Sequence, residues 1–160
     1  MLIGLPASGK STWIKECRFD LNANVVVVSS DNHIENYAIR LGKTYNDVFQ
    51  YYIKTATSLM FKDVADAIYN DCDIIWDQTN LSVKSRKSKL KLIPNTYQKI
   101  AVVFETPDNS EHTRRLDARV GKNIPLAVIS NMKGQLEIPS LLEGFDIIIF
   151  GFSSKSLFLN

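Results

Sequence analysis

The sequence predicts an α/β fold, a three-layer αβα sandwich in which helices cover both faces of a parallel central sheet. Short apolar runs recur along the chain, and segments too long for hairpins separate them. A glycine-rich phosphate-binding pattern also follows the first run. The runs are Leu2–Gly4, Val25–Ser29, Ile74–Asp77, Ile100–Phe104 and Ile147–Phe150. Continuous apolar strands of this kind are usually buried on both faces, so we expect parallel pairing with right-handed crossovers.

Helical patterns fill the segments between the runs. The longest extends from about Tyr45 to Asn70 and places its apolar residues on one face. These are Phe49, Ile53, Ala56, Met60, Val64, Ala67 and Ile68. Further helices are expected from Lys10, after Leu81, and after the capping signal at Asp108. A chain of 160 residues without a low-complexity linker predicts a single domain over residues 1–160.

The composition is that of a folded globular protein, with 45% hydrophobic residues and a formal net charge of +2. So small a charge is compatible with a polyanionic substrate but does not require one. Charged or polar residues interrupt every apolar run, and no secretion signal is found, so we expect a cytoplasmic protein without membrane contact. Cys17 and Cys72 match no metal-binding spacing and are expected to be reduced. Only Met1–Ile3 precede the phosphate-binding pattern, whereas a buried strand normally has about five residues. Residues missing upstream and an internal Met1 in a longer product both stay open as explanations.

Residues 4–11 read G-x-x-x-x-G-K-S, the pattern of a phosphate-binding loop between a strand and a helix. Glycines at both ends let successive N–H groups turn toward phosphate oxygens. Lys10 would place a cation on the β- and γ-phosphates, and Ser11 would offer a hydroxyl to Mg²⁺. We therefore expect ATP, or another nucleoside triphosphate, and Mg²⁺ to bind along this segment. Its residues are Gly4, Pro6, Ala7, Ser8, Gly9, Lys10, Ser11 and Thr12.

Two carboxylates follow predicted strands, at the sheet edge where open α/β folds bind ligands. Asp31 comes two residues after the second apolar run, and Asp77 ends the third. Asp31 is a candidate general base for an acceptor hydroxyl and a candidate metal ligand. The alternative is that Asp31 is only the N-cap of a helix over Ile34–Leu41. Asp77 is a candidate for the metal or acceptor side of the same site.

Arg86 lies on the apolar face of the helix expected after Leu81. A guanidinium in such a place must meet an anion, and both a structural carboxylate and a ligand phosphate remain open as its partner. The lysines of this segment are expected mostly to face outward into solvent. They are Lys84, Lys87, Lys89 and Lys91.

A basic helix followed by a break and a second helix predicts a lid over about residues 109–134. Arg115 and Arg119 share one face of the first helix with His112, and Gly121 breaks it. Arg119, beside the break, would neutralise charge on a transferring phosphoryl group. Surface ion pairing with acidic neighbours is the alternative for Arg115.

Five segments occur in an order that resembles the polynucleotide 5′-hydroxyl kinase family, most closely the kinase domain of phage-type polynucleotide kinase/phosphatases. They are GLPASGKST, VSSD, DQTNL, the arginines before Pro125, and EGFDIII. The resemblance covers most of the chain. It implies a P-loop kinase-type fold that transfers the γ-phosphoryl group of ATP to the 5′-hydroxyl of DNA or RNA. It also implies that Asp31 is the general base and that Arg119, helped by Arg115, binds the donor phosphates. The residues it implies for the acceptor side are Asp31, Asp77, Thr79, Asn80 and Arg86.

Two departures from the family pattern keep other functions open. The family has an arginine that grips the acceptor phosphate where this chain has Ile34, with His33, Arg40 or Arg86 as candidate substitutes. No D-x-D-G-T signature of a phosphatase domain is found. A kinase of a small metabolite or sugar-nucleotide, or a nucleotide-binding module without transferase activity, shares the same core motifs. Candidates for stacking the bases of an acceptor strand are Trp76, Tyr37 and Tyr45.

Overall fold

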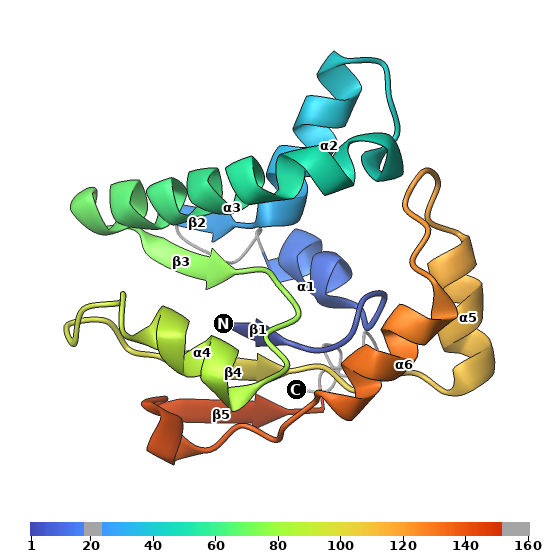
Figure 1. The fold of residues 1–160 in the computed structure, drawn as a ribbon. Coiled ribbons are helices and arrows are strands. Elements are labelled where there is room, and N and C mark those ends of the chain that lie inside the picture. The colour runs from blue at the N-terminus through green and yellow to red at the C-terminus, as the bar shows by residue number, and fades with distance from the viewer. Residues whose placement is uncertain (18–23, 152–160) are drawn as a thin grey trace.

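Parallel strands form the centre of the structure, a computed structural model that describes residues 1–17 and 24–151 (Figure 1). Within these residues there are two ladders, one in the order β1-β4-β5 and the other pairing β2 with β3. The strands are β1 (Leu2–Ile3), β2 (Val25–Val28), β3 (Asp73–Trp76), β4 (Ile100–Val103) and β5 (Ile147–Phe150). Every predicted strand is present, and all pairs are parallel, as predicted.

The two ladders meet where β3 passes beside β1. The Gly4 N–H donates to the carbonyl of Thr79 at 3.0 Å, and the Asn80 side-chain amide donates to the carbonyl of Leu2 at 2.7 Å. These bonds lie just beyond the ends of the strands, so the regular ladder is interrupted there. The strands therefore follow one another across the molecule as β2, β3, β1, β4 and β5 (Figure 1).

The helices lie where they were predicted, with two differences in their bounds. They are α1 (Lys10–Cys17), α2 (Ser30–Arg40), α3 (Tyr45–Tyr69), α4 (Val83–Leu90), α5 (Asn109–Asp117) and α6 (Leu126–Gly134), with a 3₁₀ turn η1 (Leu141–Glu143). Helix α2 begins at Ser30 instead of Ile34, and α5 ends at Asp117, so Arg119 lies beyond this helix and not on its face. Thr44 and Asp47 form a reciprocal capping box that begins α3, and the Asp108 carboxylate caps α5. None of the described helices combines the length and apolarity that crossing a membrane requires. Cys72 is a buried free thiol, and the side chain of Cys17 lies outside what the structure describes.

Successive strand residues point to opposite faces of the sheet and make separate cores on each side. On one face the buried cluster is Leu2, Ile14, Ile75, Val102 and Phe104, with α1 packed against it. On the other face are two clusters, Ile3, Leu90, Ala101 and Phe145 under α4, and Val28, Met60, Val64 and Trp76 under α3. The predicted three-layer αβα sandwich is thus confirmed.

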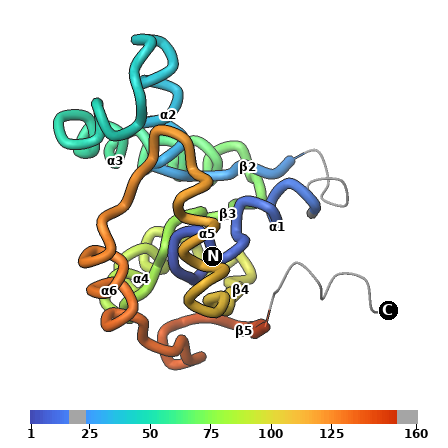
Figure 2. The backbone as a smooth tube through the Cα atoms, turned by 90° about the vertical axis from the view of Figure 1, so that its right-hand side faces the viewer, coloured from blue at the N-terminus to red at the C-terminus, as the bar shows by residue number. Residues whose placement is uncertain are grey.

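Helices α2 and α3 form a hairpin that extends beyond the sheet and has a core of its own (Figure 1). Its buried residues are Ile34, Ala38, Val48 and Ala56. The N-cap position of α2 is Ser29, so the alternative that Asp31 caps this helix is wrong. Asp31 instead lies in the first turn of α2, at the carboxyl end of β2. Seen from the side (Figure 2), residues 118–125 rise from α5 and α6 and reach this hairpin.

Candidate functional site

A cavity of about 1120 Å³ opens at the carboxyl ends of the central strands. Its lining comes from the glycine-rich loop with the start of α1, the start of α2, the first two turns of α3, and residues 77–79 after β3. Helices α5 and α6 and the segment between them line the remaining side. Among the predicted site residues, Lys10, Ser11, Asp31, Asp77, Thr79, Arg115 and Arg119 all line this cavity.

The glycine-rich loop has the geometry of an anion cradle. A Cβ on Gly4 would come within 2.8 Å of the Ser8 hydroxyl and 3.0 Å of Phe104 Cβ, so only glycine fits against Phe104, the residue after β4. Gly9 has a φ of 103° and Ala7 a φ of 61°, in the left-handed region that tight loops use. The first N–H groups of α1 lack intrahelical acceptors and begin at this loop, so the residues present fit a phosphate group.

Lys10 is buried at the base of the loop. Its ammonium donates to the carbonyls of Gly4 at 2.9 Å and Leu5 at 2.7 Å. Burial lowers the pKa of Lys10 to about 8, while the nearby Asp77 carboxylate works against that shift. The hydroxyl-bearing Ser11 is exposed beside it on the cavity wall. A buried cation that is held by neutral carbonyls can exchange them for phosphate oxygens.

Asp31 is held from two sides by residues that the sequence did not single out as its partners. The Tyr45 hydroxyl donates to one carboxylate oxygen at 2.9 Å, and the Lys122 ammonium donates to the other at 2.5 Å. Lys122 also donates to Glu35 at 2.9 Å and lies 4.1 Å from the centre of the Tyr45 ring. Burial, followed by the charge of Asp31, raises the pKa of Tyr45, so Tyr45 stays a hydrogen-bond donor.

The segment after β3 places a second carboxylate beside the loop. The Asp77 N–H donates to the Val28 carbonyl at 2.9 Å, which fixes Asp77 next to the end of β2. Burial raises the pKa of Asp77, and the Lys10 ammonium opposes this rise. The next residue, Gln78, donates to the Ser30 hydroxyl at 2.9 Å and so ties this segment to the start of α2.

The two predicted lid arginines differ in their partners. Arg115 pairs with Glu111 at 2.6 Å, as the ion-pairing alternative expected, although it also lines the cavity. Arg119 is half-buried, and within residues 1–17 and 24–151 no hydrogen bond or ion pair holds its guanidinium. Its positive charge opposes protonation of Lys10 and lowers the pKa of that lysine, so the two cations are electrostatically coupled across the same cavity.

Two residues expected on the acceptor side lie in the framework instead of the cavity. Arg86 is fully buried and makes a bidentate ion pair with Glu143, at 2.7 and 2.8 Å, so a structural carboxylate is its partner. Asn80 is also buried, and its side-chain carbonyl accepts a hydrogen bond from Lys89 at 2.5 Å. The expectation that Lys89 faces outward is therefore wrong, because the buried side-chain carbonyl of Asn80 needs a hydrogen-bond donor and the Lys89 ammonium supplies it.

The remaining candidates for binding the acceptor phosphate, His33 and Arg40, also lie outside the cavity lining. Ile34, which stands in place of the family's arginine, is fully buried in the hairpin core. His33 shares a 2.6 Å hydrogen bond with Asp63, and Arg40 lies over the Tyr37 ring. The cation beside Asp31 is Lys122, which follows the predicted break at Gly121, and no local pattern marks it because its partners are about 90 residues away.

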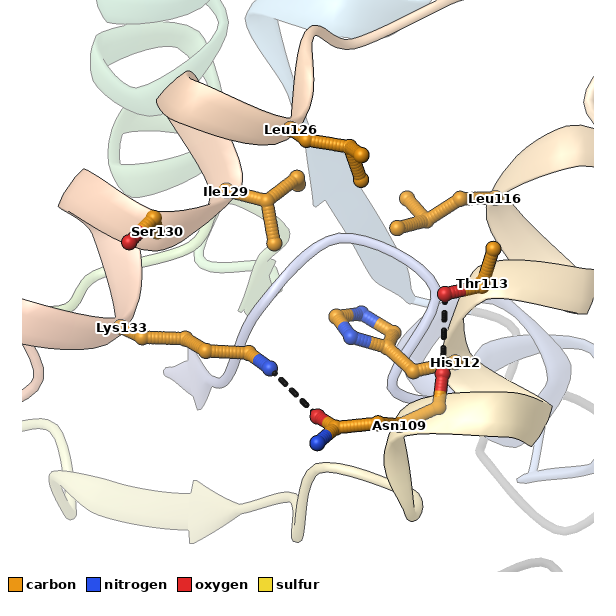
Figure 3. A pocket seen from close by; sticks show the side chains of 8 residues that line it. All are labelled: Asn109, His112, Thr113, Leu116, Leu126, Ile129, Ser130 and Lys133. Atoms are coloured by element: carbon orange, nitrogen blue, oxygen red, sulfur yellow. Dashed lines mark hydrogen bonds between the residues drawn. The ribbon is translucent and has the colours of Figure 1, made fainter.

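Figure 3 shows a smaller pocket of about 210 Å³ between α5 and α6, where Leu116 faces Leu126. Lys133 donates to the Asn109 side chain at 3.0 Å across it. His112 is buried at its edge, and its Nε2 donates to the Pro6 carbonyl at 2.8 Å. His112 thus connects α5 to the phosphate loop and has a structural role here.

Comparisons with known proteins agree with this geometry. The AAA domain family matches residues 1–139 of the chain. Heterogeneous nuclear ribonucleoprotein U-like protein 2 of Mus musculus is 22% identical over 161 aligned positions, which cover 94% of this chain and 21% of that protein. The chain therefore spans about a fifth of the length of this relative. The glycine-rich loop, the parallel sheet and the family match agree, and the chain belongs to the AAA domain family, a P-loop NTPase-like family that includes polynucleotide kinase domains.

Proposed function

We propose that this protein transfers the γ-phosphoryl group of ATP to the 5′-hydroxyl end of DNA or RNA in a Mg²⁺-dependent reaction. One observation carries the proposal: a single cavity holds the Lys10 loop, the Asp31 carboxylate and the Arg119 guanidinium. These are the three kinds of group that phosphoryl transfer to an alcohol needs, namely a phosphate cradle, a base and a cation for developing charge.

On the donor side, the loop N–H groups and Lys10 would hold the β- and γ-phosphates. Mg²⁺, held with Ser11 and phosphate oxygens and near Asp31, would neutralise charge on the transferring group. Arg119, two residues beyond the end of α5, would add its charge to the same oxygens, with Arg115 on α5 as a helper. In this proposal residues 109–134 act as the lid, and His112 links the lid to the loop.

On the acceptor side, Asp31 would accept the proton of the 5′-hydroxyl as the new O–P bond forms. The bond between the γ-phosphorus and the β–γ bridging oxygen breaks, and ADP leaves. Tyr45 and Lys122 each donate to one Asp31 oxygen, which fixes the carboxylate orientation but leaves acceptor capacity on both oxygens. An Asp31 that is 47% exposed within the cavity remains open to an incoming hydroxyl.

The relative described as a ribonucleoprotein supports a polynucleotide acceptor. The acceptor side also supports a second candidate, a kinase of a small metabolite or sugar-nucleotide, because none of His33, Arg40 and Arg86 lines the cavity. A nucleotide-binding module without transferase activity would share the loop. It would, however, leave Asp31 and Arg119 without a role.

An acceptor panel with γ-labelled ATP and Mg²⁺ tests the proposal. We expect label on 5′-hydroxyl DNA or RNA and none on sugars, nucleosides or sugar-nucleotides. Replacing the base in Asp31→Asn should lower turnover by about 10²- to 10⁴-fold and leave ATP affinity unchanged. Asp66→Asn, the same change at an exposed carboxylate of α3 outside the cavity lining, is the matched control. Label found only on a small metabolite, or full turnover in Asp31→Asn, would overturn the proposal.

A further inference from the structure

The first two turns of α3 form a cavity wall of which only Tyr45 takes part in the proposed phosphoryl transfer. Its lining residues are Tyr45, Asn46, Phe49 and Gln50. Where the phosphoryl-transfer groups lie, the cavity presents carboxylates and cations, whereas these four residues supply two aromatic rings and two amides. A wall of this kind suits an uncharged, flat and hydrogen-bonding group rather than a phosphate.

Phe49 is the exposed apolar member of this wall, with 38% of its surface open. Its ring centre lies 5.4 Å from that of Tyr45, at a tilt of 30°. The Tyr45 hydroxyl in turn donates to Asp31 at 2.9 Å. A continuous aromatic path of two side chains therefore leads from the candidate base outward along the wall.

The amides beside Phe49 have hydrogen-bonding capacity to spare. Gln50 is exposed and, in the part of the chain that the structure describes, its side chain has no partner. Asn46 donates from its amide nitrogen to the Asn123 carbonyl at 3.0 Å, and its carbonyl oxygen accepts no bond within that same part. An amide offers both donors and acceptors, and so it can match the edge of any base.

The cavity also has apolar side chains that come from beyond Lys122. Ile124, Val128 and Met132 line it from the α5–α6 connection and from α6. The main-chain bond from Asn46 N–H to the Gly121 carbonyl, at 3.2 Å, holds that connection against the start of α3. Apolar surface thus lies on two sides of the cavity.

We propose that this wall is the subsite for the nucleobase of the 5′-terminal nucleotide of the acceptor, an inference that rests on the proposed function. The base stacks on Phe49, its edge bonds to Gln50, and its 5′-hydroxyl reaches Asp31. Stacking on one ring with an adaptable amide tolerates every base, so the subsite recognises a polynucleotide end without sequence preference. The other aromatic candidates do not compete, because Trp76 is buried in the core and Tyr37 lies outside the cavity lining.

Phe49→Ala tests the subsite through the KM for a 5′-hydroxyl oligonucleotide. Loss of one stacked base should raise this KM by about 5- to 150-fold, with the KM for ATP unchanged. Phe49→Tyr should keep the wild-type KM. Tyr51→Ala, which removes an exposed aromatic ring of α3 outside the cavity lining, is the matched control and should also leave KM unchanged. An acceptor with an abasic 5′ residue should bind the wild type weakly and be insensitive to Phe49→Ala.

Equilibrium binding of the same oligonucleotide separates the two proposals. If the wild type transfers phosphate and Phe49→Ala has an unchanged KM, the subsite is refuted and the kinase function stands. If the wild type binds the oligonucleotide through Phe49 but transfers nothing to it, the kinase function is refuted and the subsite stands. A wild type that neither binds nor phosphorylates the oligonucleotide refutes both.

Discussion

Replacing Lys122 by methionine should destabilise the protein although the residue belongs to no helix or strand. Lys122 is only 9% exposed and joins Asp31 and Glu35, which are 47% and 48% exposed. Its removal leaves two carboxylates near each other and without their shared cation. The Tyr45 ring also loses the ammonium that lies 4.1 Å from its centre.

The size of the effect follows from the mixed burial of this group. Breaking a fully buried ion pair costs about 3–5 kcal/mol, and breaking an exposed pair about 0–1 kcal/mol. Because the lysine is buried but its partners are half-exposed, we expect a loss of about 2 kcal/mol in the free energy of unfolding. For a domain of this length, that loss lowers Tm by about 4–8 °C.

Thermal unfolding followed by circular dichroism measures this loss, with Lys54→Met on the exposed side of α3 as the control. Adding Glu35→Gln to Lys122→Met should restore part of the stability, because the double variant lacks one of the repelling carboxylates. An unchanged Tm for Lys122→Met, or strict additivity with Glu35→Gln, would refute the assignment of Lys122 as the cation that holds these acids.

Two further predictions concern buried cations. Arg86→Met should lower the free energy of unfolding, measured in urea, by about 3–5 kcal/mol, because it leaves Glu143 buried without its bidentate partner. A double variant with Glu143→Gln should be less destabilised than Arg86→Met, and an equal loss of stability in the two variants would contradict this. The pKa of Lys10 is lowered to about 8, so its ammonium is present below pH 8 and lost above it in the free protein. Affinity for ATP should therefore weaken by about tenfold between about pH 8 and 9.5, measured by calorimetry, and Lys10→Arg should show a flat profile over that range.

The fold was predictable because its signals are local. Each strand is a short apolar run, the apolar period predicts α3, and the capping signal at Asp108 predicts where α5 begins. The phosphate loop is equally local, since one continuous stretch, residues 4–11, encodes it. The meeting of β1 with β3 was not predicted in detail, because it depends on Asn80 in a left-handed conformation with its side chain turned into the sheet.

The partners of Asp31 could not be predicted from the sequence, for a different reason. Asp31 and Tyr45 meet within the α2–α3 hairpin, and only the docking of residues 118–125 on the hairpin brings Lys122 to them. For Arg86, the sequence predicted the burial but not the partner. Its apolar surroundings predicted a buried guanidinium with an anion, but whether that anion was Glu143 or a ligand depended on where η1 packs.

The buried cluster between α2 and α3 has a consequence for how the proposed nucleobase subsite at the start of α3 can change by mutation. The cluster Ile34, Ala38, Val48 and Ala56 shares no residue with the cluster beneath the phosphate loop, and α3 packs on the sheet through other residues, Met60 and Val64. Substitutions at sites that share no partners have nearly additive effects. Substitutions confined to this cluster can thus reshape the proposed nucleobase subsite while the residues packed beneath the phosphate loop keep their sequence.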